Sequence, residues 1–407
     1  MKVCVIGAGV IGCATAFTLQ KAGHEVTVVD AAPAAGTETS FANGGQLSYS
    51  YVEPFASPST FFSLPRYLFD ASSPVRFRLQ ADTRQWLWGA RFLWACRRKR
   101  TLAGTNALLA LAQESRAALE SWMNEGELAF NFARNGKLVL CPDARVLASQ
   151  AAQVAAQAHA GVRQELLNRD ECVAREPALR HYASRFAGGV WTPTECVGDS
   201  HLYCHALEGA ARARGARFVY GSEVRRIVQR HGMARAAVTA AGEVEADAFV
   251  LCAGVGGRGL AASLGERLPI YPIKGYSVTL AMRPDSPPPT VSVTDLSRKM
   301  VLAPLGGRLR VAAMAEVVGY SRDVPSERVD QMLDAVETIY PGLCLREDTA
   351  PWAGLRPATP DSVPIVRRSR VPNAVLNLGH GGLGFTLAAG SAMRVAHLLG
   401  EPARDCA

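Results

Sequence analysis

The sequence predicts an α/β fold built around a Rossmann-like, parallel nucleotide-binding sheet. Three observations support this: a strand–turn–helix–strand unit at residues 2–30, an apolar strand at 248–252, and a strand, glycine cluster and helix at 374–399. Strands that alternate with helices are typical of parallel sheets. The 407 residues, of which 48% are hydrophobic and 20% charged, are enough for one large or two ordinary globular domains.

The first unit contains every element of a βαβ motif. Residues 2–6 (KVCVI) form an apolar strand, and the glycine-rich segment GAGVIG follows at 7–12. The pattern predicts a helix from about residue 11 to 21 and a second strand at 25–29, which ends in Asp30. This order is the fingerprint of a dinucleotide-binding site in its required context.

Each residue type in this motif has a mechanical reason. Gly7 permits the tight turn, Gly9 lets the backbone approach a pyrophosphate, and Gly12 allows the helix to pack closely on the strand. The helix N-terminus offers free N–H groups and a partial positive charge to the phosphates. Asp30 can accept both ribose hydroxyls and would repel a 2′-phosphate, so the motif favours NAD or FAD over NADP.

Composition and charge indicate the compartment in which the protein works and the classes of partner that it lacks motifs for. The sequence has ten cysteines, and no two of them are spaced as a CxxC pair, which is typical of a reduced, cytoplasmic protein. The formal charge of +8 is dispersed except at 97–100 (RRKR), and no nucleic-acid motif accompanies it. The apolar N-terminus also resembles a secretion signal, but the nucleotide motif explains the same residues. No apolar run reaches 18 residues, and no metal-ligand pattern is present.

Further elements follow from apolar periodicity. The stretch 86–94, with three tryptophans, is interpreted either as core or domain-interface packing or as a membrane-facing helix. The basic run at 97–100 is interpreted as a solvated helix end or an anionic-lipid contact. Residues 39–46 carry hydroxyl and amide groups able to bind phosphate and a flavin ring edge. We also expect helices at 104–125, 144–157 and 202–214, strands at 137–141 and 217–220, a small β-meander across 224–246, and a turn at 283–290.

The C-terminal region repeats the strand–glycine–helix pattern. Strands are predicted at 364–366 and 374–378, followed by the cluster GHGGLGFT at 379–386 and a helix to about 399. The positive end of this helix would face the negative charge that a reduced flavin carries near N1 and O2. A second nucleotide-facing helix tip is therefore expected here.

Four side chains are candidates for substrate chemistry. Arg356 can bind a substrate carboxylate through its forked donors, or form a structural ion pair with an acid such as Asp361. His380 is a candidate base or a positioning residue, and Tyr276 and Tyr51 are hydroxyl donors that could line the pocket or be structural.

Six segments carry a resemblance to a known family. They are VIGAGVIGCATAFTLQKAGHEVTVVD at 5–30, ETSFANGGQLS at 38–48, KGYS at 274–277, MAEVVGY at 314–320, GLRPATPD at 354–361 and LGHGGLGFTLAAGS at 378–391. Over nearly its whole length the chain resembles the D-amino acid oxidase superfamily of flavoproteins and, within it, the D-amino acid dehydrogenase small subunits.

The resemblance implies an α/β FAD-binding Rossmann-like domain with an inserted α+β substrate domain of mainly antiparallel sheet. Residues 1–56, 198–268 and 348–407 would form the first, and 57–197 and 269–347 the second. FAD would be bound non-covalently, since no cysteine matches the flavin-linked one of the sarcosine oxidases. The implied FAD contacts are Gly7, Gly9, Val10, Ile11, Gly12, Asp30, Ala31, Ser40, Asn43, Gly44, Gly45, Gln46, Leu47, Val224, Ala253, Gly254, Gly381, Gly382, Leu383, Gly384, Phe385 and Thr386.

The implied activity is oxidative deamination of small D-amino acids to 2-oxo acids and ammonia. Arg356 would hold the substrate carboxylate while hydride passes from Cα to flavin N5, and electrons would go on to a quinone-type acceptor, with peripheral contact at the cytoplasmic face of the inner membrane. Alternatives are a dehydrogenase of D-proline or D-hydroxyproline, a glycine- or sarcosine-type oxidase using oxygen, and a flavoprotein without amine chemistry. Two positions depart from the family: Gly45 replaces the usual Ala, and Glu53 is an unusual charge near the expected pocket.

Overall fold

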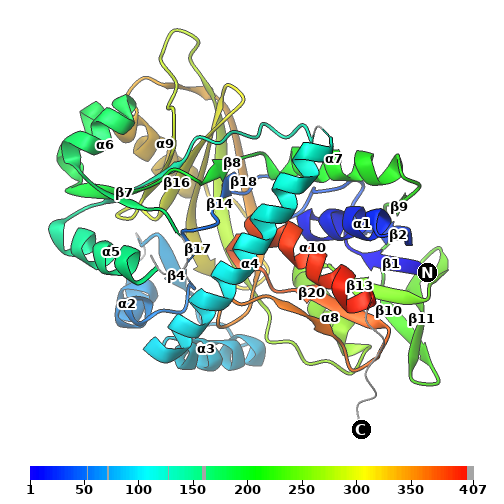
Figure 1. Ribbon diagram of the computed structural model, residues 1–407. Coiled ribbons are helices and arrows are strands. Elements are labelled where there is room, and N and C mark those ends of the chain that lie inside the picture. The colour runs from blue at the N-terminus through cyan, green and yellow to red at the C-terminus, as the bar shows by residue number, and fades with distance from the viewer. Residues whose placement is uncertain (53, 71–72, 127, 158–161, 401–407) are drawn as a thin grey trace.

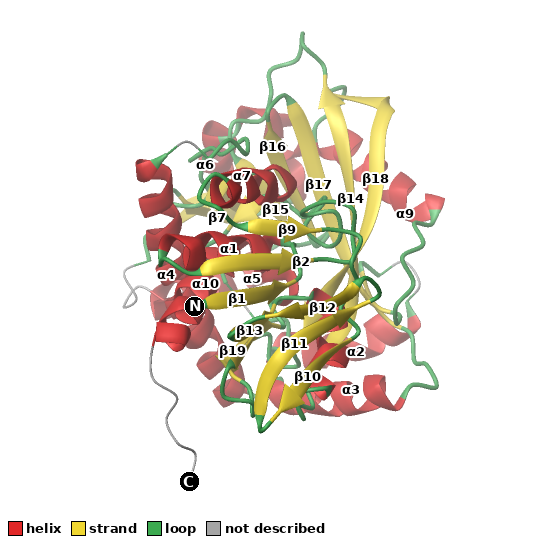
Figure 2. Ribbon diagram, turned by 90° about the vertical axis from the view of Figure 1, so that its right-hand side faces the viewer, coloured by secondary structure: helices red, strands yellow, loops and turns green. Residues whose placement is uncertain are grey.

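Two large sheets organise the protein (Figures 1 and 2). The computed structural model describes residues 1–52, 54–70, 73–126, 128–157 and 162–400. One sheet has six mainly parallel strands, and the other has nine mainly antiparallel strands. This arrangement confirms the predicted combination of a Rossmann-like sheet with an α+β part. Glu53, the unusual charge noted in the sequence, lies outside the described residues.

The six-stranded sheet has the order β19-β20-β13-β1-β2-β9. Only β19 runs antiparallel to its neighbour, so the carboxyl ends of the other five strands share one edge. Ligands of open α/β sheets bind at this edge. The strands are β1 (Lys2–Ile6), β2 (Glu25–Val29), β9 (Arg217–Val219), β13 (Ala248–Leu251), β19 (Ile365–Arg368) and β20 (Ala374–Leu378).

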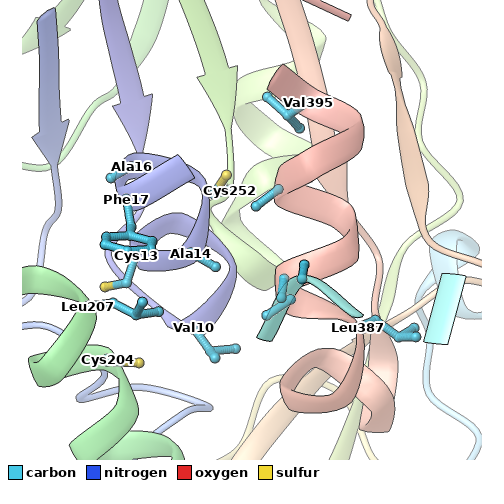
Figure 3. Close-up of a cluster of buried hydrophobic side chains, with 14 of the residues drawn as sticks. Val10, Cys13, Ala14, Ala16, Phe17, Cys204, Leu207, Cys252, Leu387 and Val395 are labelled. Carbon is cyan, nitrogen blue, oxygen red and sulfur yellow. The ribbon is translucent and has the colours of Figure 1, made fainter. Parts of the chain in front are cut away.

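Four helices cover one face of this sheet: α1 (Val10–Lys21), α4 (Arg98–Glu125), α7 (Ser200–Arg212) and α10 (Gly384–Gly400). Figure 3 shows α1 between α7 and α10, with Cys13 directed toward Cys204 and Leu207 of α7. Small side chains such as Ala14 let α1 and α10 pack closely, so the two helix N-termini from opposite ends of the chain lie together.

The other face is covered by the β-meander expected near 224–246. Its strands are β10 (Arg226–Arg230), β11 (Met233–Thr239) and β12 (Gly242–Glu245), and α8 (Gly257–Ala262) lies beside them. Apolar residues of β10, β11 and α8 pack against β1, β13 and β20. The parallel sheet is therefore buried on both faces, as its continuous apolar strands require.

The nine-stranded sheet has the order β18-β14-β17-β16-β15-β5-β7-β6, with β4 paired to β17. Two helices, α6 (Arg169–Arg175) and α9 (Ser326–Ile339), and a 3₁₀ segment at Pro177–Arg185 bury its outer face. The strands are β4 (Val75–Phe77), β5 (Lys137–Cys141), β6 (Glu165–Asn168), β7 (Gly188–Thr192), β14 (Tyr271–Met282), β15 (Ser292–Asp295), β16 (Met300–Leu305), β17 (Arg308–Val317) and β18 (Cys344–Ala358).

The two sheets are connected by elements that cross the expected domain ranges. Helix α4 lies in the expected substrate-domain range 57–197, but it packs against α10 of the FAD-binding range. Strand β18 begins before residue 348 and ends after it, so it contains residues of both expected domains, and it pairs with β14 of the antiparallel sheet. A short ribbon of β3 (Gln46–Leu47) and β8 (Cys196–Val197) is a further connection between the two sheets. Helix α5 (Ala144–Gln157) lies near β7. The region between the sheets is therefore enclosed by both.

Helices α2 (Pro58–Phe69) and α3 (Thr83–Ala95) lie together at one end of the molecule in both views (Figures 1 and 2). Trp88 and Phe92 of α3 are buried and stacked, whereas Trp86 and Trp94 are about half exposed. Core packing, one of the two alternatives for this stretch, thus holds for one face of the helix, while the opposite face carries exposed apolar side chains. The basic run follows directly: Arg97 precedes α4, and Arg98–Arg100 form its first turn.

A buried ion pair fixes α9 to the antiparallel sheet. The Arg328 guanidinium donates to Oε1 of Glu316 at 2.7 and 3.1 Å, and the Tyr276 hydroxyl donates to Oε2 at 2.8 Å. Both charged side chains are only 6% exposed. Because the carboxylate is satisfied from both sides, the cluster joins α9, β17 and β14 at one point.

We expect Arg328→Met to lower the free energy of unfolding by about 3–5 kcal/mol, because it leaves the Glu316 carboxylate buried without its cation. Urea denaturation followed by circular dichroism measures this. The matched control is Arg346→Met, which removes an exposed pair with Asp334 and should change stability little. Equal effects of the two substitutions would contradict the assignment.

Candidate active site

A narrow groove lies at the carboxyl edge of the parallel sheet. It contains a cavity of about 120 Å³ between the turn after β1, the ends of β2 and β13, and the turn after β20. Many residues predicted to contact a nucleotide line this cavity: Gly7, Gly9, Val10, Ile11, Asp30, Ser40, Gly254, Gly381 and Gly384. The candidate base His380 lines it as well. Residues far apart in the sequence therefore form one continuous groove.

The β1–α1 turn is possible only with glycine. Gly7 has φ +108°, and a Cβ atom there would lie 2.6 Å from the carbonyl oxygen of Cys252. A Cβ atom at Gly12 would overlap the carbonyl oxygen of Gly7. Asp30 is held at the end of β2, because its carboxylate accepts the backbone N–H groups of Ala8 and Ala32.

The N-termini of α1 and α10 both open onto the groove. Val10 donates its backbone N–H to the Ser40 hydroxyl at 3.0 Å, which anchors the 39–46 segment against the first turn of α1. A 3₁₀ turn at Gly381–Leu383 leads into α10, and the residues from Gly381 to Thr386 all line the larger cavity described next. The partial positive charges of two helices therefore face one ligand space.

The groove continues into a cavity of about 460 Å³ between the two sheets. The two spaces share wall residues, among them Val10, Ser40 and Gly384. Within the described part of the chain, the wall of the larger cavity carries the cations of Lys137, Lys299 and Arg356 and no carboxylate. Such a wall favours an anionic occupant.

Arg356 lies on β18, at the junction of the two sheets. Its Nη1 donates to the carbonyl oxygen of Met314 at 3.1 Å, and no carboxylate of the described residues pairs with it. The alternative ion pair with Asp361 does not form, since that carboxylate is exposed and accepts from the Val363 backbone N–H instead. Burial lowers the pKa of Arg356 below its ordinary value. A half-buried cation facing a cavity is suited to bind an anion.

Two features that the sequence did not reveal hold Arg356 in place. Gly275 is paired with Gly354 on the neighbouring strand, and a Cβ atom at Gly275 would overlap the Arg356 guanidinium. Beside it the pairing of β14 with β17 shifts register, and Met314 adopts φ +67°. This left-handed conformation in a bulge directs the Met314 carbonyl at Arg356.

The two candidate tyrosines line the larger cavity, but their hydroxyl groups already have partners. The Tyr276 hydroxyl donates to Glu316, and burial raises its pKa above the ordinary range. The Tyr51 hydroxyl donates to Oε1 of Gln150 at 3.0 Å. Both rings therefore shape the cavity, while their hydroxyl groups are directed to protein acceptors.

His380 is buried at the end of β20. Its Nε2 lies 2.9 Å from the Ser391 hydroxyl, and burial lowers its pKa to about 3. The ring is therefore neutral at physiological pH, and an interaction with α10 uses one ring nitrogen. This geometry favours the positioning role over the catalytic base.

Most of the remaining predicted contacts also reach a cavity. Asn43, Gly44, Gly45, Gln46, Leu383 and Phe385 line the larger one. Gly45 has φ +67°, and a Cβ atom there would lie 3.0 Å from Leu305, which accounts for glycine at this position. Five predicted residues line neither space: Gly12 lies beneath the turn, Leu47 and Val224 are in the core, Ala31 is exposed, and Ala253 directly precedes Gly254 of the groove wall.

Lys137 is a third feature that sequence analysis missed. It begins the apolar strand β5, where a lysine resembles an ordinary strand end, yet its side chain is 5% exposed and lines the larger cavity. Its Nζ donates to the Ser48 hydroxyl at 3.0 Å and lies 4.6 Å from the centre of the Tyr51 ring. Burial lowers its pKa to about 8, against the opposing effect of the Glu195 charge.

Metal-ligand clusters and thiols are the other reactive groups to place among the described residues. No group of three or more His, Cys, Asp or Glu side chains is arranged there to hold a metal ion. Cys252 lines the groove, but burial raises its pKa to about 12, so its thiol is protonated. None of the described helices is long and apolar enough to cross a bilayer.

The fold and the site define a dinucleotide-dependent oxidoreductase, in which a Rossmann-type groove leads to a cation-lined reaction cavity. The chain belongs to the family described as FAD dependent oxidoreductase, which matches residues 2–398. It is 42% identical over 415 residues to D-amino acid dehydrogenase 2 of Ralstonia nicotianae, covering 99% of this chain and 97% of the relative.

Two further comparisons agree with this assignment. D-amino acid dehydrogenase 2 of Pseudomonas aeruginosa is 41% identical over 402 residues, covering 98% of this chain and 95% of the relative. The solved structure of glycine oxidase from Geobacillus kaustophilus has the same fold, with TM-score 0.77, 23% identity and coverage of 100% and 96% of the two chains. The predicted fold class, family and FAD cofactor are thereby confirmed.

The residues present fit FAD. The glycine turn after β1 leaves the space that a Cβ atom would fill, and Asp30 is fixed where a ribose would lie. The groove joins the Arg356 cavity through shared wall residues at the tips of α1 and α10, so one elongated ligand can reach both spaces. In this chain, residues of the two helix tips would hold the cofactor.

We expect Gly12→Ala to abolish FAD retention, because the new methyl group would force the turn after β1 apart. The flavin-to-protein absorbance ratio of the purified protein measures this. Gly209→Ala is the matched control: Gly209 lies in α7, and beyond its own helix no atom lies within 4 Å of the place that a new methyl group would take, so this variant should keep its flavin. A yellow Gly12→Ala protein would contradict the role of this turn.

Proposed function

We propose that this protein dehydrogenates small D-amino acids, yielding 2-oxo acids and ammonia. The observation that carries the proposal is Arg356, a cation without a carboxylate partner among the described residues, facing a cavity at the end of the FAD groove. The substrate class is supported by the relatives named D-amino acid dehydrogenase, which match 98–99% of the chain.

The first step is binding and orientation of the substrate. The Arg356 guanidinium receives the α-carboxylate through its forked N–H groups, while the Met314 carbonyl and the open space above Gly275 keep it in position. The Tyr276 and Tyr51 rings limit the space left for the side chain. Fixing the carboxylate in this way sets the direction of the Cα–H bond.

The second step requires no strong base in the protein. A substrate that binds with a neutral amine loses hydride from Cα and becomes an iminium, which water hydrolyses to the 2-oxo acid and ammonium. FAD supplies the hydride acceptor for this reaction when it is bound. The neutral His380 ring takes no proton here, and its interaction with Ser391 keeps the turn before α10 in place.

Anaerobic bleaching of the yellow protein tests the proposal directly. We expect D-alanine and related small D-amino acids to bleach it, and their L-enantiomers not to do so. D-proline or glycine as the best substrate would favour the alternatives from the sequence. Hydrogen peroxide formed at the rate of substrate loss would identify an oxidase instead. A protein that no amino acid bleaches would overturn the proposal.

Replacing Arg356 by Ala should lower kcat/KM for D-alanine roughly 30- to 5000-fold, because the carboxylate loses its partner. This factor corresponds to a loss of transition-state stabilisation on the order of 2–5 kcal/mol. Steady-state kinetics with an artificial electron acceptor measure the effect. Arg394→Ala is the control. Arg394 lies on α10, and its half-exposed side chain pairs with Glu114 of α4. Normal turnover in Arg356→Ala would show that another group binds the carboxylate.

We further propose that the electrons leave to a quinone-type acceptor at a membrane surface. Ten of the sixteen exposed large hydrophobic side chains in the described residues lie between Phe61 and Leu102. We call this the α2–α3 face; its most exposed members are Phe62 at 80% and Phe69 at 86%. A concentration of exposed apolar side chains of this kind marks an interaction site.

Charge and position favour an anionic bilayer as its partner. The exposed cations at 97–100 begin α4 immediately beside α3, and the Arg100 guanidinium lies 3.8 Å from the centre of the Trp94 ring. Apolar side chains flanked by arginine and lysine are typical of interfacial helices. Ser57, Ser59, Thr60 and Tyr67, from α2 and its N-cap, line the reaction cavity. An acceptor in the bilayer would thus be one helix away.

We expect the protein to sediment with vesicles that contain phosphatidylglycerol, and high salt to weaken this binding. The double variant Phe62→Ser/Phe69→Ser should bind at least roughly tenfold more weakly, because each phenyl group contributes about 1.5–3 kcal/mol when buried. Leu166→Ser/Leu202→Ser is the control, since both leucines are exposed but lie on other elements, β6 and α7. Equal binding by all three proteins would rule the surface out.

A further inference from the structure

The buried ammonium group of Lys137 is a charge that the proposed mechanism does not use. Ser48 is its one hydrogen-bond acceptor in the described part of the chain, although an ammonium group carries three N–H donors. No described carboxylate lies within ion-pair distance of it. The charge is therefore held against the cavity without being neutralised by contact.

The compensating carboxylate lies behind the cavity wall. Glu195 is 1% exposed and accepts the backbone N–H groups of Tyr49, Ser50 and Tyr51 at 2.7, 2.7 and 3.3 Å. It acts on Lys137 only through space, and it does not line the cavity. The positive charge thus faces the ligand space and the negative charge faces the core.

Two hydrogen bonds connect Lys137 to the first turn of α10. Its Nζ donates to the Ser48 hydroxyl at 3.0 Å, and the Ser48 backbone N–H donates to the Thr386 hydroxyl at 3.1 Å. Thr386 lies in the first turn of α10, whose partial positive charge also faces the cavity. The full charge of Lys137 and the helix tip therefore act on the same region.

We propose that Lys137 is a redox-tuning residue, which stabilises the negative charge that the bound flavin gains near the α10 tip when it is reduced. The proposal rests on the proposed function only in assuming that the flavin ring occupies this cavity. A substrate hydride brings two electrons and one proton to the flavin, which leaves one net negative charge on the ring. Inside a protein, where the effective dielectric constant is lower than in water, a nearby cation stabilises this charge more than it would in solution.

The midpoint potential of the bound flavin is the decisive measurement. The midpoint potential depends on the difference in binding free energy between reduced and oxidised flavin. A substitution that weakens the binding of both forms equally therefore does not shift the potential. We expect Lys137→Met to lower the equilibrium constant for reduction at least tenfold, which is about 30 mV for a two-electron couple. Titration of the FAD-loaded protein with a chemical reductant and a reference dye needs no substrate, so it also succeeds if the proposed activity is wrong.

Three variants complete the test. Lys137→Arg keeps the charge and should restore the potential, whereas Ser48→Ala frees the ammonium group and should shift it partly in the direction of Lys137→Met. Lys274→Met is the matched control, because Lys274 is also buried over a tyrosine ring but does not line the cavity. An unchanged potential in Lys137→Met, or an equal shift in Lys274→Met, would overturn the proposal, as would loss of FAD affinity and thermal stability without a shift.

Discussion

The close approach of backbone to backbone at the carboxyl edge of the parallel sheet is the constraint on which the site depends. β13 lies between β1 and β20 in parallel register, so the turn after the first strand and the turn after the last strand meet at one edge. Glycine at 7 and 12 removes the side chains that would separate strand, turn and helix. The helix tips, the groove and the cavity beyond it follow from this contact.

Sequence analysis predicted the elements whose signals are local. The motif at 2–30 and the cluster at 379–386 combine glycine turns, apolar strands and helical spacing within short segments, so their structures could be inferred without knowing the fold. The surroundings of Arg356 could not be inferred, since they depend on the register that places Gly275 against Gly354 and on a bulge at Met314. Lys137 was overlooked because its burial depends on distant Ser48 and Glu195.

The cations and the carboxylates around the cavity lie at different depths. The guanidinium of Arg356 and the ammonium of Lys137 line the wall, while the buried carboxylates of Glu195 and Glu316 lie behind it and are satisfied by backbone N–H groups or by Arg328. A carboxylate in the wall would pair with either cation and cancel its field. Placing the acids one layer deeper keeps the cations buried at tolerable cost and leaves their charge available to an incoming anion.

Helix α2 has two surfaces with opposite requirements. Its N-terminal hydroxyl groups, on Ser59 and Thr60, face the reaction cavity, whereas Phe62 and Phe69 are directed to the outside. A helix on the surface of a globular protein normally buries its apolar stripe. Here the inner side of α2 adjoins the reaction cavity, and Thr60 is its one buried residue, so the apolar stripe is left exposed in the described chain. Covering that stripe with lipid would remove the mismatch, and it would bring the hydrocarbon phase that dissolves a quinone to the wall of the cavity where the flavin is expected to be reduced.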